Sequence, residues 1–446
     1  MTATIIAQQF VKMLKILYVP FFLVVAFVLV TLYDNEFIEP KSQPICFIAT
    51  ATLGCCLACL FFRFLSITCH AISKPKRKLD NEDGKWPNVS IIRPLHGTDP
   101  LMAERIESIF KLNYPGNFEI IFCLDNGNDQ AKPVVERIMQ QYAHIDAKIC
   151  IDPNVEILNP CLRNLEQGIR HANYKDSLIW LSAARVSCDS NEMKDMVVRC
   201  CQNQSLVVQH QYVKASCDTK LSFINTLERV FFSSNSLIYV LALQLLNQPC
   251  VTSMSLVMTR NLLKKLGGCR TLGKFLAEDF IIGETCEKLN INIDISHYPV
   301  RQDNSRSLTM ESLIDRQIRW LKLRLNLLPT VVIFLEKISL PLITCLLFSM
   351  SCNYLFGISY TSTFFPALLL IFIQDFVLFS MIDYTANQLE NFPNALTYIY
   401  SWFMVQFLQI LVLFIAAKDS SHIIWGNKIY TISNKTLIKD VNSYKE

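Results

Sequence analysis

The amino-acid sequence predicts an α/β domain with a mostly parallel β-sheet, inserted between an N-terminal and a C-terminal membrane region. Three observations predict this class. The chain of 446 residues is 51% hydrophobic and only 18% charged, which is more apolar than an ordinary soluble protein. Apolar runs that approach membrane-spanning length lie only towards the two ends of the chain. The polar middle, residues 75–327, alternates short β-rich runs with amphipathic helical patterns.

The N-terminal membrane region, residues 1–74, contains two predicted spans, Ile16–Tyr33 and Pro44–Ile67. Lys12 and Lys15 precede the first, the acidic stretch DNEFIEPKSQ separates the two, and SKPKRK follows the second. The positive-inside rule therefore predicts that the N-terminus and the chain after residue 74 face the cytosol. A cleaved signal peptide is the alternative for the first run, but VTLYDNE lacks a small-x-small cleavage site.

The middle of the chain is predicted to form one domain with a sheet covered by helices. The stretches PLMAERIESIFKL and KPVVERIMQQYA repeat apolar residues at three- and four-residue spacing, which predicts helices packed on a sheet. Ligands of such sheets bind at the carboxyl ends of the strands. Neither a Walker loop nor G-x-G-x-x-G is present, which argues against an ATPase or a dinucleotide-dependent dehydrogenase. Strands are expected at Val89–Leu95, Phe118–Leu124, Ala147–Ile151, Ser177–Ser182, Ser205–Val213 and Ile291–Ser296.

The C-terminal membrane region, residues 328–417, contains about three apolar segments, Leu328–Tyr354, Thr361–Met381 and Leu396–Ala417. Glu336 and Lys337 interrupt the first segment, so part of it is also compatible with an interfacial or re-entrant position. Residues 418–446 form a polar tail with several lysines, and the sequence leaves the side of the membrane it occupies open.

Composition also bounds the partners of the protein. A formal net charge of +4 without a basic stripe excludes nucleic acid as an expected partner. The 17 cysteines include one C-x-x-C, Cys56 to Cys59, which lies inside an apolar run without a second pair. Buried reduced thiols are therefore favoured over a zinc site, and a reducing compartment over an oxidising one.

Polar residues that follow predicted strands are the candidate ligands. Asp125 and Asp129 lie in CLDNGNDQA, where an Asp- and Asn-rich loop is equally compatible with a plain turn. Glu278 and Asp279 lie in FLAEDF, where adjacent carboxylates either complement a helix dipole or include a catalytic base.

The stretch DRQIRWLKLRLNLL carries a concentration of cations directly before the C-terminal membrane region. Arg316, Arg319 and Trp320 open it. An interfacial amphipathic helix with a tryptophan anchor explains the pattern. A diphosphate clamp explains it as well, because guanidinium groups bind phosphates bidentately.

Taken together, these stretches resemble the ceramide glucosyltransferase (glucosylceramide synthase) family, membrane glycosyltransferases of the GT-A fold. The resemblance runs from about Phe47 to IIWGNKIY near the C-terminus and rests on VSIIRPLHGTDP, LNYPGNFEIIFCLDNGNDQA, NPCLRNL, TLERVFF, CVTSMS, AEDF and RQIRWLKLRLNLLP in that order. It implies transfer of glucose from UDP-glucose to ceramide in the bilayer, with inversion, on the cytosolic face of the Golgi. It also implies a divalent cation, Mg²⁺ or Mn²⁺, together with basic side chains at the departing UDP. The sequence leaves the oligomeric state open.

The resemblance assigns roles to particular residues. Asp279 corresponds to the general base, and Arg316, Arg319 and Trp320 lie in the position of the family motif Q/R-x-x-R-W near the diphosphate and the acceptor. The nucleotide is expected to contact residues in the loops after the first two strands. These are Arg93, Gly97, Asp99, Asp125 and Asp129.

Several positions depart from the family pattern, and one of them bears on metal binding. The second motif aspartate aligns with Ala183 in SAARV, and alanine cannot bind a metal. Three explanations remain open: metal binding through Ser182, Asp189 or Glu278; a cation such as Arg185 in place of the metal; or a catalytically impaired protein that still binds lipid or a partner. Another lipid-directed GT-A membrane glycosyltransferase is a further alternative.

Overall fold

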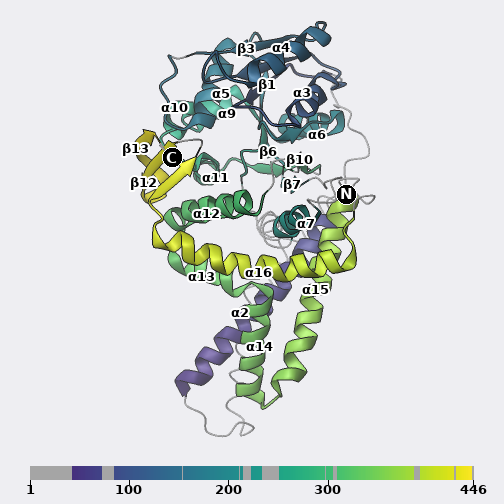
Figure 1. The fold of residues 1–446 in the computed structure, drawn as a ribbon, viewed down its shortest axis with the longest axis vertical. Helices are drawn as coiled ribbons and strands as arrows, with labels where there is room; N and C mark the ends of the chain where they lie inside the picture. The colour runs from purple at the N-terminus through teal and green to yellow at the C-terminus, as the bar shows by residue number, and fades with distance from the viewer. Residues whose placement is uncertain are drawn as a thin grey trace.

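The computed structural model describes residues 43–72, 85–152, 154–209, 211–213, 222–233, 251–296, 298–304, 309–385, 392–425 and 428–443. An α/β domain stands at one end of the molecule, and a group of long helices extends away from it (Figure 1). The predicted first span, residues 16–33, lies outside the described residues.

The α/β domain is built on a seven-stranded sheet of order β3-β2-β1-β4-β8-β6-β9. β1 pairs in parallel with β2 and β4, β2 with β3, and β6 with β9, whereas β8 runs antiparallel to both of its neighbours. The expectation of a mostly parallel sheet is thus confirmed. The strands are β1 (Val89–Pro94), β2 (Phe118–Cys123), β3 (Ala147–Cys150), β4 (Leu178–Ser182), β6 (Leu206–Val208), β8 (Ser255–Thr259) and β9 (Ile293–Ile295).

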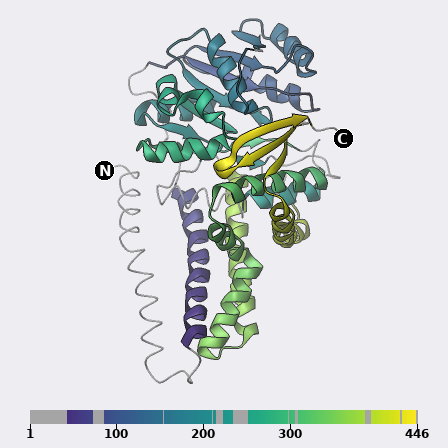
Figure 2. The same cartoon turned by 90° about the vertical axis from the view of Figure 1, so that its left-hand side faces the viewer.

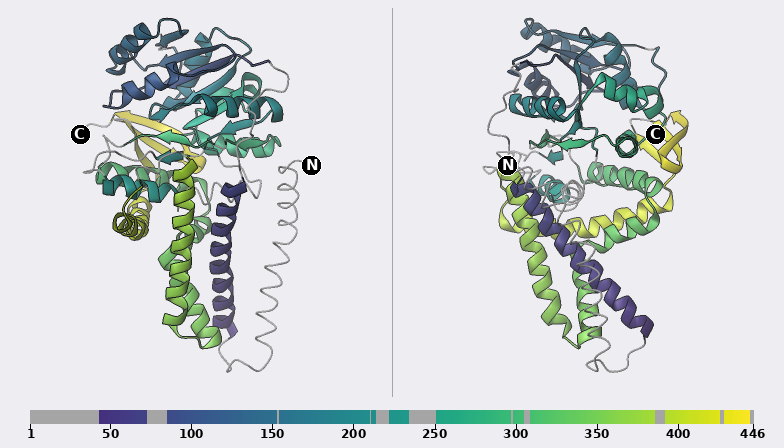
Figure 3. Two further views of the ribbon diagram at one scale, coloured as in Figure 1. Left: turned by 90° about the vertical axis from the view of Figure 1, so that its right-hand side faces the viewer. Right: turned by 180° about the vertical axis from the view of Figure 1, so that it is seen from behind.

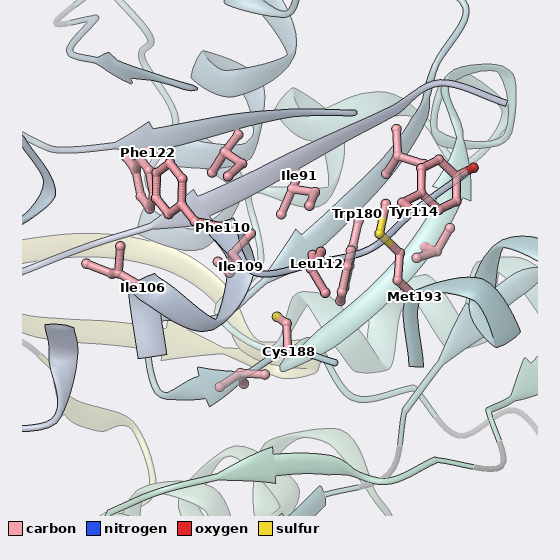
Figure 4. Packing of buried hydrophobic residues seen from close by; sticks show 14 of the residues in the cluster. Ile91, Ile106, Ile109, Phe110, Leu112, Tyr114, Phe122, Trp180, Cys188 and Met193 are labelled. Atoms are coloured by element: carbon pink, nitrogen blue, oxygen red, sulfur yellow. The ribbon is translucent and has the colours of Figure 1, made fainter. Parts of the chain in front are cut away.

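Both faces of the central strands are buried, because their side chains alternate between two hydrophobic clusters. Ile91 of β1 and Trp180 of β4 belong to one cluster, and their neighbours Ile92 and Ile179 belong to the other. Figure 4 shows the first cluster, where Phe110 of a covering helix stacks on Phe122 of β2, with ring centroids 6.0 Å apart. The covering helices are α3 (Met102–Phe110), α4 (Ala131–Gln141), α5 (Pro160–His171), α6 (Ser190–Asn203), α9 (Arg260–Lys265), α10 (Gly268–Leu272) and α11 (Glu278–Lys288).

The sequence predictions for this domain differ from the structure at several strands. The predicted strand Ser205–Val213 is divided, because its second half forms β7 (Gln211–Val213) of a separate small sheet. In that sheet β10 (Val300–Gln302) lies between β7 and β5 (Val186–Ser187). β8 has no counterpart among the predicted strands.

The polar tail folds into a third sheet, which sequence analysis did not predict. Its antiparallel strands are β11 (His422–Trp425), β12 (Lys428–Ser433) and β13 (Leu437–Ser443). The sheet packs against the segment of the α/β domain before α11: Leu276 N donates to Thr436 O at 2.9 Å, and Ile438 N donates to Lys274 O at 2.9 Å. The C-terminal end of the described chain therefore lies on the α/β domain (Figure 2).

Three helices form the bundle that extends from the domain: α2 (Gln43–Ile72), α14 (Pro341–Phe356) and α15 (Tyr360–Thr385). A buried ion pair, Arg63 with Asp375, joins α2 to α15.

The predicted segment Leu328–Tyr354 is broken into α13 (Thr330–Ile338) and α14, which meet at an angle of 83°. Three described helices are long and apolar enough to cross a membrane, within Pro44–Thr68, Tyr360–Tyr384 and Ala395–Lys418.

The last of these candidates, α16 (Ala395–Lys418), lies crosswise between the domain and the bundle (Figure 3). Its buried side packs against α7 (Ser222–Val230) and α12 (Met310–Leu327), for example through Trp402 and Val405. Its other side exposes large apolar side chains. These include Leu396, Tyr400, Phe407 and Phe414.

Candidate active site

The turn after β4 lies at the carboxyl end of the sheet, where the resemblance expects a metal ligand. Ala183 N donates to Met254 O at 2.9 Å, and Val186 N donates to Ala183 O at 3.2 Å, which closes a tight turn. The methyl groups of Ala183 and Ala184 are half-buried, whereas Arg185 is exposed. The turn therefore presents a guanidinium group instead of a carboxylate.

The buried side chain of Arg93 stabilises this turn through hydrogen bonds. Its side chain is 0% exposed, and it donates to Ser182 Oγ at 3.2 Å, Ala184 O at 2.9 Å and Val186 O at 2.6 Å. Burial lowers the pKa of Arg93 to about 10. The structure thus places Arg93 beneath the turn as a brace, and its contact with a nucleotide stays a prediction.

A second arginine braces the same turn. Arg105 of α3 donates from Nε to Ala184 O at 3.2 Å and forms an ion pair with Asp99. Asp99 Oδ1 also accepts from Leu101 N at 3.0 Å, which fixes the start of α3. Asp99 therefore connects the loop after β1 to the turn after β4.

Asp129 joins the loops after β1 and β2. Its carboxylate accepts from Gly97 N at 3.0 and 3.2 Å and from Ala131 N at 2.8 Å. Gly97 has a φ of +63°, which side-chain-bearing residues rarely adopt, and a Cβ there would point into open space. The predicted residues Gly97, Asp99 and Asp129 are thus brought together. Asp125 lies nearer the end of β2, at the start of the same loop, and pairs with Arg163 at 2.7 Å.

The two adjacent carboxylates open α11. Asn159 Nδ2 donates to Glu278 Oε2 at 2.7 Å, and burial raises the pKa of Glu278. Burial and the neighbouring charge of Glu278 raise the pKa of Asp279 to about 7. The positive charge of Arg324 of α12 lowers the pKa of Asp279 and so opposes part of this increase. A carboxylate with a pKa near neutrality suits a general base.

Asn159 is a residue whose importance sequence reasoning missed. Its Oδ1 caps α5 by accepting from Cys161 N at 2.8 Å, while its Nδ2 also donates to Phe275 O at 2.9 Å. One side chain thus holds the start of α5 against the strand-like segment that leads to Glu278. The available signal was the N-cap pattern Asn159-Pro160.

A chain of hydrogen bonds joins the turn after β4 to α12. Arg185 Nη1 donates to Asn304 Oδ1 at 3.4 Å, Asn304 Nδ2 donates to Glu228 Oε1 at 3.0 Å, and Arg316 Nη1 donates to the same oxygen at 2.6 Å. Glu228 is 0% exposed. Sequence analysis quoted the stretch that contains Glu228 but singled out neither Glu228 nor Asn304.

The remaining residues of the α12 motif lie next to this chain. Arg319 lies over the ring of Trp425, 5.7 Å from its centroid, so the C-terminal sheet contacts the motif. Trp320 stacks on Phe231 at 6.5 Å and meets Phe232 edge-on at 5.8 Å. The structure therefore brings Arg316, Arg319 and Arg185 to one side of the domain, above α16.

The donor set at the turn does not fit a divalent cation. Within the described ranges, no group of three or more His, Cys, Asp or Glu side chains is placed to hold a metal ion. The alternative ligands are engaged elsewhere: Ser182 accepts from Arg93, Asp189 caps α6, and Glu278 accepts from Asn159. Cations surround the turn where the metal ligands were expected.

Comparisons with known proteins agree on a family. The profile of "Glycosyl transferase family 21" matches residues 50–438. "Ceramide glucosyltransferase 3" of Caenorhabditis elegans is 30% identical over 369 residues, covering 81% of this chain and 77% of the relative. "Ceramide glucosyltransferase 1" of the same organism is 28% identical over 353 residues, covering 79% and 73%.

A solved structure, the mannosyltransferase PcManGT from Pyrobaculum calidifontis in complex with GDP-Man and Mn²⁺, superposes with a TM-score of 0.43 at 14% identity, covering 84% of this chain and 98% of that one. The profile match spans most of the chain, including the turn after β4, α11 and α12. The chain is a glycosyltransferase and belongs to glycosyl transferase family 21.

Proposed function

We propose that this protein transfers glucose from UDP-glucose to the primary hydroxyl of ceramide, with inversion, on the cytosolic face of Golgi or ER–Golgi membranes. The observation that carries the proposal is the placement of Asp279 beside α12, whose arginines lie above the crosswise helix α16. Leu276 and Leu323 pack in one hydrophobic cluster, which fixes the segment before Asp279 against α12. The names of the nematode relatives supply the acceptor and the sugar.

The chemistry follows from these positions. Asp279 takes the proton from the ceramide hydroxyl while that oxygen attacks the anomeric carbon from the face opposite the UDP. The bond from the anomeric carbon to the phosphate oxygen breaks, and its electron pair leaves with UDP. Guanidinium groups of Arg316 and Arg319 stabilise the charge that develops on the departing diphosphate. Gly97, Asp99, Asp125 and Asp129 shape the loops proposed to receive the nucleotide.

The test is transfer of radiolabelled glucose from UDP-glucose to a short-chain ceramide, in membranes that lack endogenous activity. Asp279→Asn is expected to reduce transfer by about 10²- to 10⁴-fold, the usual contribution of general-base catalysis, while UDP binding is retained. Glu136→Gln, on the exposed side of α4, is the matched control and keeps full activity. Transfer by Asp279→Asn at the wild-type rate would remove the assignment of the base.

Ala183 favours a second candidate, a family member that binds UDP-glucose without turnover. In that case the wild-type protein binds UDP-glucose but transfers no sugar to ceramide or to any other lipid acceptor. Transfer to a polyprenyl phosphate instead of ceramide would identify another lipid-directed glycosyltransferase. The same assay with both acceptors separates these outcomes.

A further inference from the structure

The replacement of an acidic turn by SAARV changes the charge at the carboxyl end of β4. Arg185 is the third residue of the tight turn Ala183–Val186, and its backbone O accepts from Asp303 N at 3.2 Å. The pairing of β5 with β10 continues from this contact. Because Arg93 and Arg105 hold the other carbonyls of the turn, the backbone at Arg185 is fixed from three sides.

The side chain of Arg185, by contrast, is exposed. Its Nη1 donates a long hydrogen bond of 3.4 Å to Asn304 Oδ1. Among the described residues, Glu228 is the carboxylate within ion-pair distance of the group formed by Arg185, Arg316 and Arg319, and it pairs with Arg316. Positive charge at this place therefore exceeds the negative charge that contacts it.

The electrostatics of the three guanidinium groups agree with this excess. Although Arg185 is exposed, neighbouring protein atoms partly desolvate its guanidinium group, and this desolvation, followed by the charge of Arg316, lowers its pKa. Burial, followed by Arg316 and Arg185, lowers the pKa of Arg319 to about 10. The three cations thus repel one another, and a bound dianion would relieve the repulsion.

We propose that Arg185, together with Arg316 and Arg319, binds the diphosphate of the sugar nucleotide in place of a divalent cation, so that nucleotide binding and transfer require no metal. This inference rests on the proposed function for the identity of the nucleotide. Guanidinium groups donate to phosphate oxygens in a bidentate manner and keep their charge at every physiological pH. When the glycosyl–oxygen bond breaks, the electron pair stays on the β-phosphate oxygen of UDP, where these cations stabilise it, and the proton of the acceptor goes to Asp279.

The experiment measures UDP binding to the full-length protein in lipid nanodiscs by calorimetry, after EDTA treatment and again with added Mn²⁺ or Mg²⁺. The dissociation constant is expected to change less than twofold between these conditions. Arg185→Gln is expected to weaken UDP binding at least tenfold in EDTA, and Arg185→Lys less, because lysine keeps the charge but not the bidentate geometry. Arg137→Ala, an exposed arginine on α4, is the control and leaves UDP binding unchanged.

Two results would overturn the inference: UDP binding that disappears in EDTA and returns with Mn²⁺, or an Arg185→Gln protein that binds UDP as Arg137→Ala does. Thermal unfolding of each variant shows that it is folded, and the exposed position of Arg185 predicts an unchanged melting temperature. If UDP binding depends on Arg185 and resists EDTA while no glucose reaches ceramide, the proposed function fails and the anion site stands. If ceramide is glucosylated only with metal present, the proposed function stands and the anion site fails.

Discussion

At the scale of single residues, the two adjacent carboxylates of α11 interact, because the charge of Glu278 affects the pKa of Asp279. Asn159 donates to Glu278, and burial together with the charge of Glu278 raises the pKa of Asp279 to about 7. A base with this pKa is mostly protonated below neutral pH and mostly charged above it. The kcat/KM of transfer is therefore expected to rise with pH through about 7, by close to tenfold per pH unit on the acidic side.

Glu278→Gln tests the cause of this pH dependence. The substitution removes the neighbouring negative charge, so the pKa of Asp279 falls and the midpoint of the acidic limb moves to lower pH. The pH profile of kcat/KM measures the shift, and Glu287→Gln, near the end of the same helix, is the control with an unmoved midpoint. An acidic limb that stays in place in Glu278→Gln would show that another group titrates.

The sequence could single out Asp279, Arg316 and Arg319 as candidate site residues because they lie in contiguous, ordered motifs. It could not identify Asn304 or Glu228, because their importance comes from contacts between segments far apart in the chain: Asn304 Nδ2 reaches Glu228 Oε1 at 3.0 Å over 76 positions. Likewise, the burial of Arg93 follows from the closing of the turn above it, which no local pattern encodes.

At the scale of elements, the C-terminal sheet supports the catalytic segment. Thr436 is 0% exposed, its O accepts from Leu276 N at 2.9 Å, and its Oγ1 accepts from Ala277 N at 3.2 Å. These are the two residues directly before Glu278 and Asp279. The strand KIYTIS alternates apolar and polar residues, a pattern that sequence analysis did not assign to a sheet. The isolated bridge between Phe275 and Leu437 shows that the sheet forms on the domain.

Thr436→Val tests this support. Valine keeps the shape and the β-branch at a φ of +57°, but it leaves the buried Ala277 N–H without its acceptor, at a cost of about 1–3 kcal/mol. Transfer assays are expected to give a reduced kcat while the dissociation constant of UDP is unchanged. Thr436→Ser restores the hydroxyl and the activity. Equal kcat in the valine and serine variants would mean that the hydroxyl does not position the base.

At the scale of the whole molecule, the arrangement of the helices fixes the side on which the tail lies. α14 leads away from the domain and α15 returns to it, so α16 begins on the side of the domain (Figure 1). The tail after α16 is hydrogen-bonded to the domain through Thr436 and Leu276, so α16 also ends on that side. Although its length and composition fit a span, we therefore expect α16 to lie along the membrane surface, with the exposed Phe407 and Phe414 towards the lipid.

This arrangement predicts that the C-terminus and the catalytic domain face the cytosol together. A C-terminal epitope tag is expected to be accessible to antibody after selective permeabilisation of the plasma membrane, and Asn434 in the sequon NKT is expected to stay unglycosylated. The same tag inserted after Gly357, at the turn between α14 and α15, is the control and becomes accessible only after full permeabilisation. Glycosylation of Asn434, or a C-terminal tag that behaves like the control, would mean that α16 crosses the bilayer. The contact between Thr436 and the catalytic segment could then not form, because it requires the tail and the domain to share one side of the membrane.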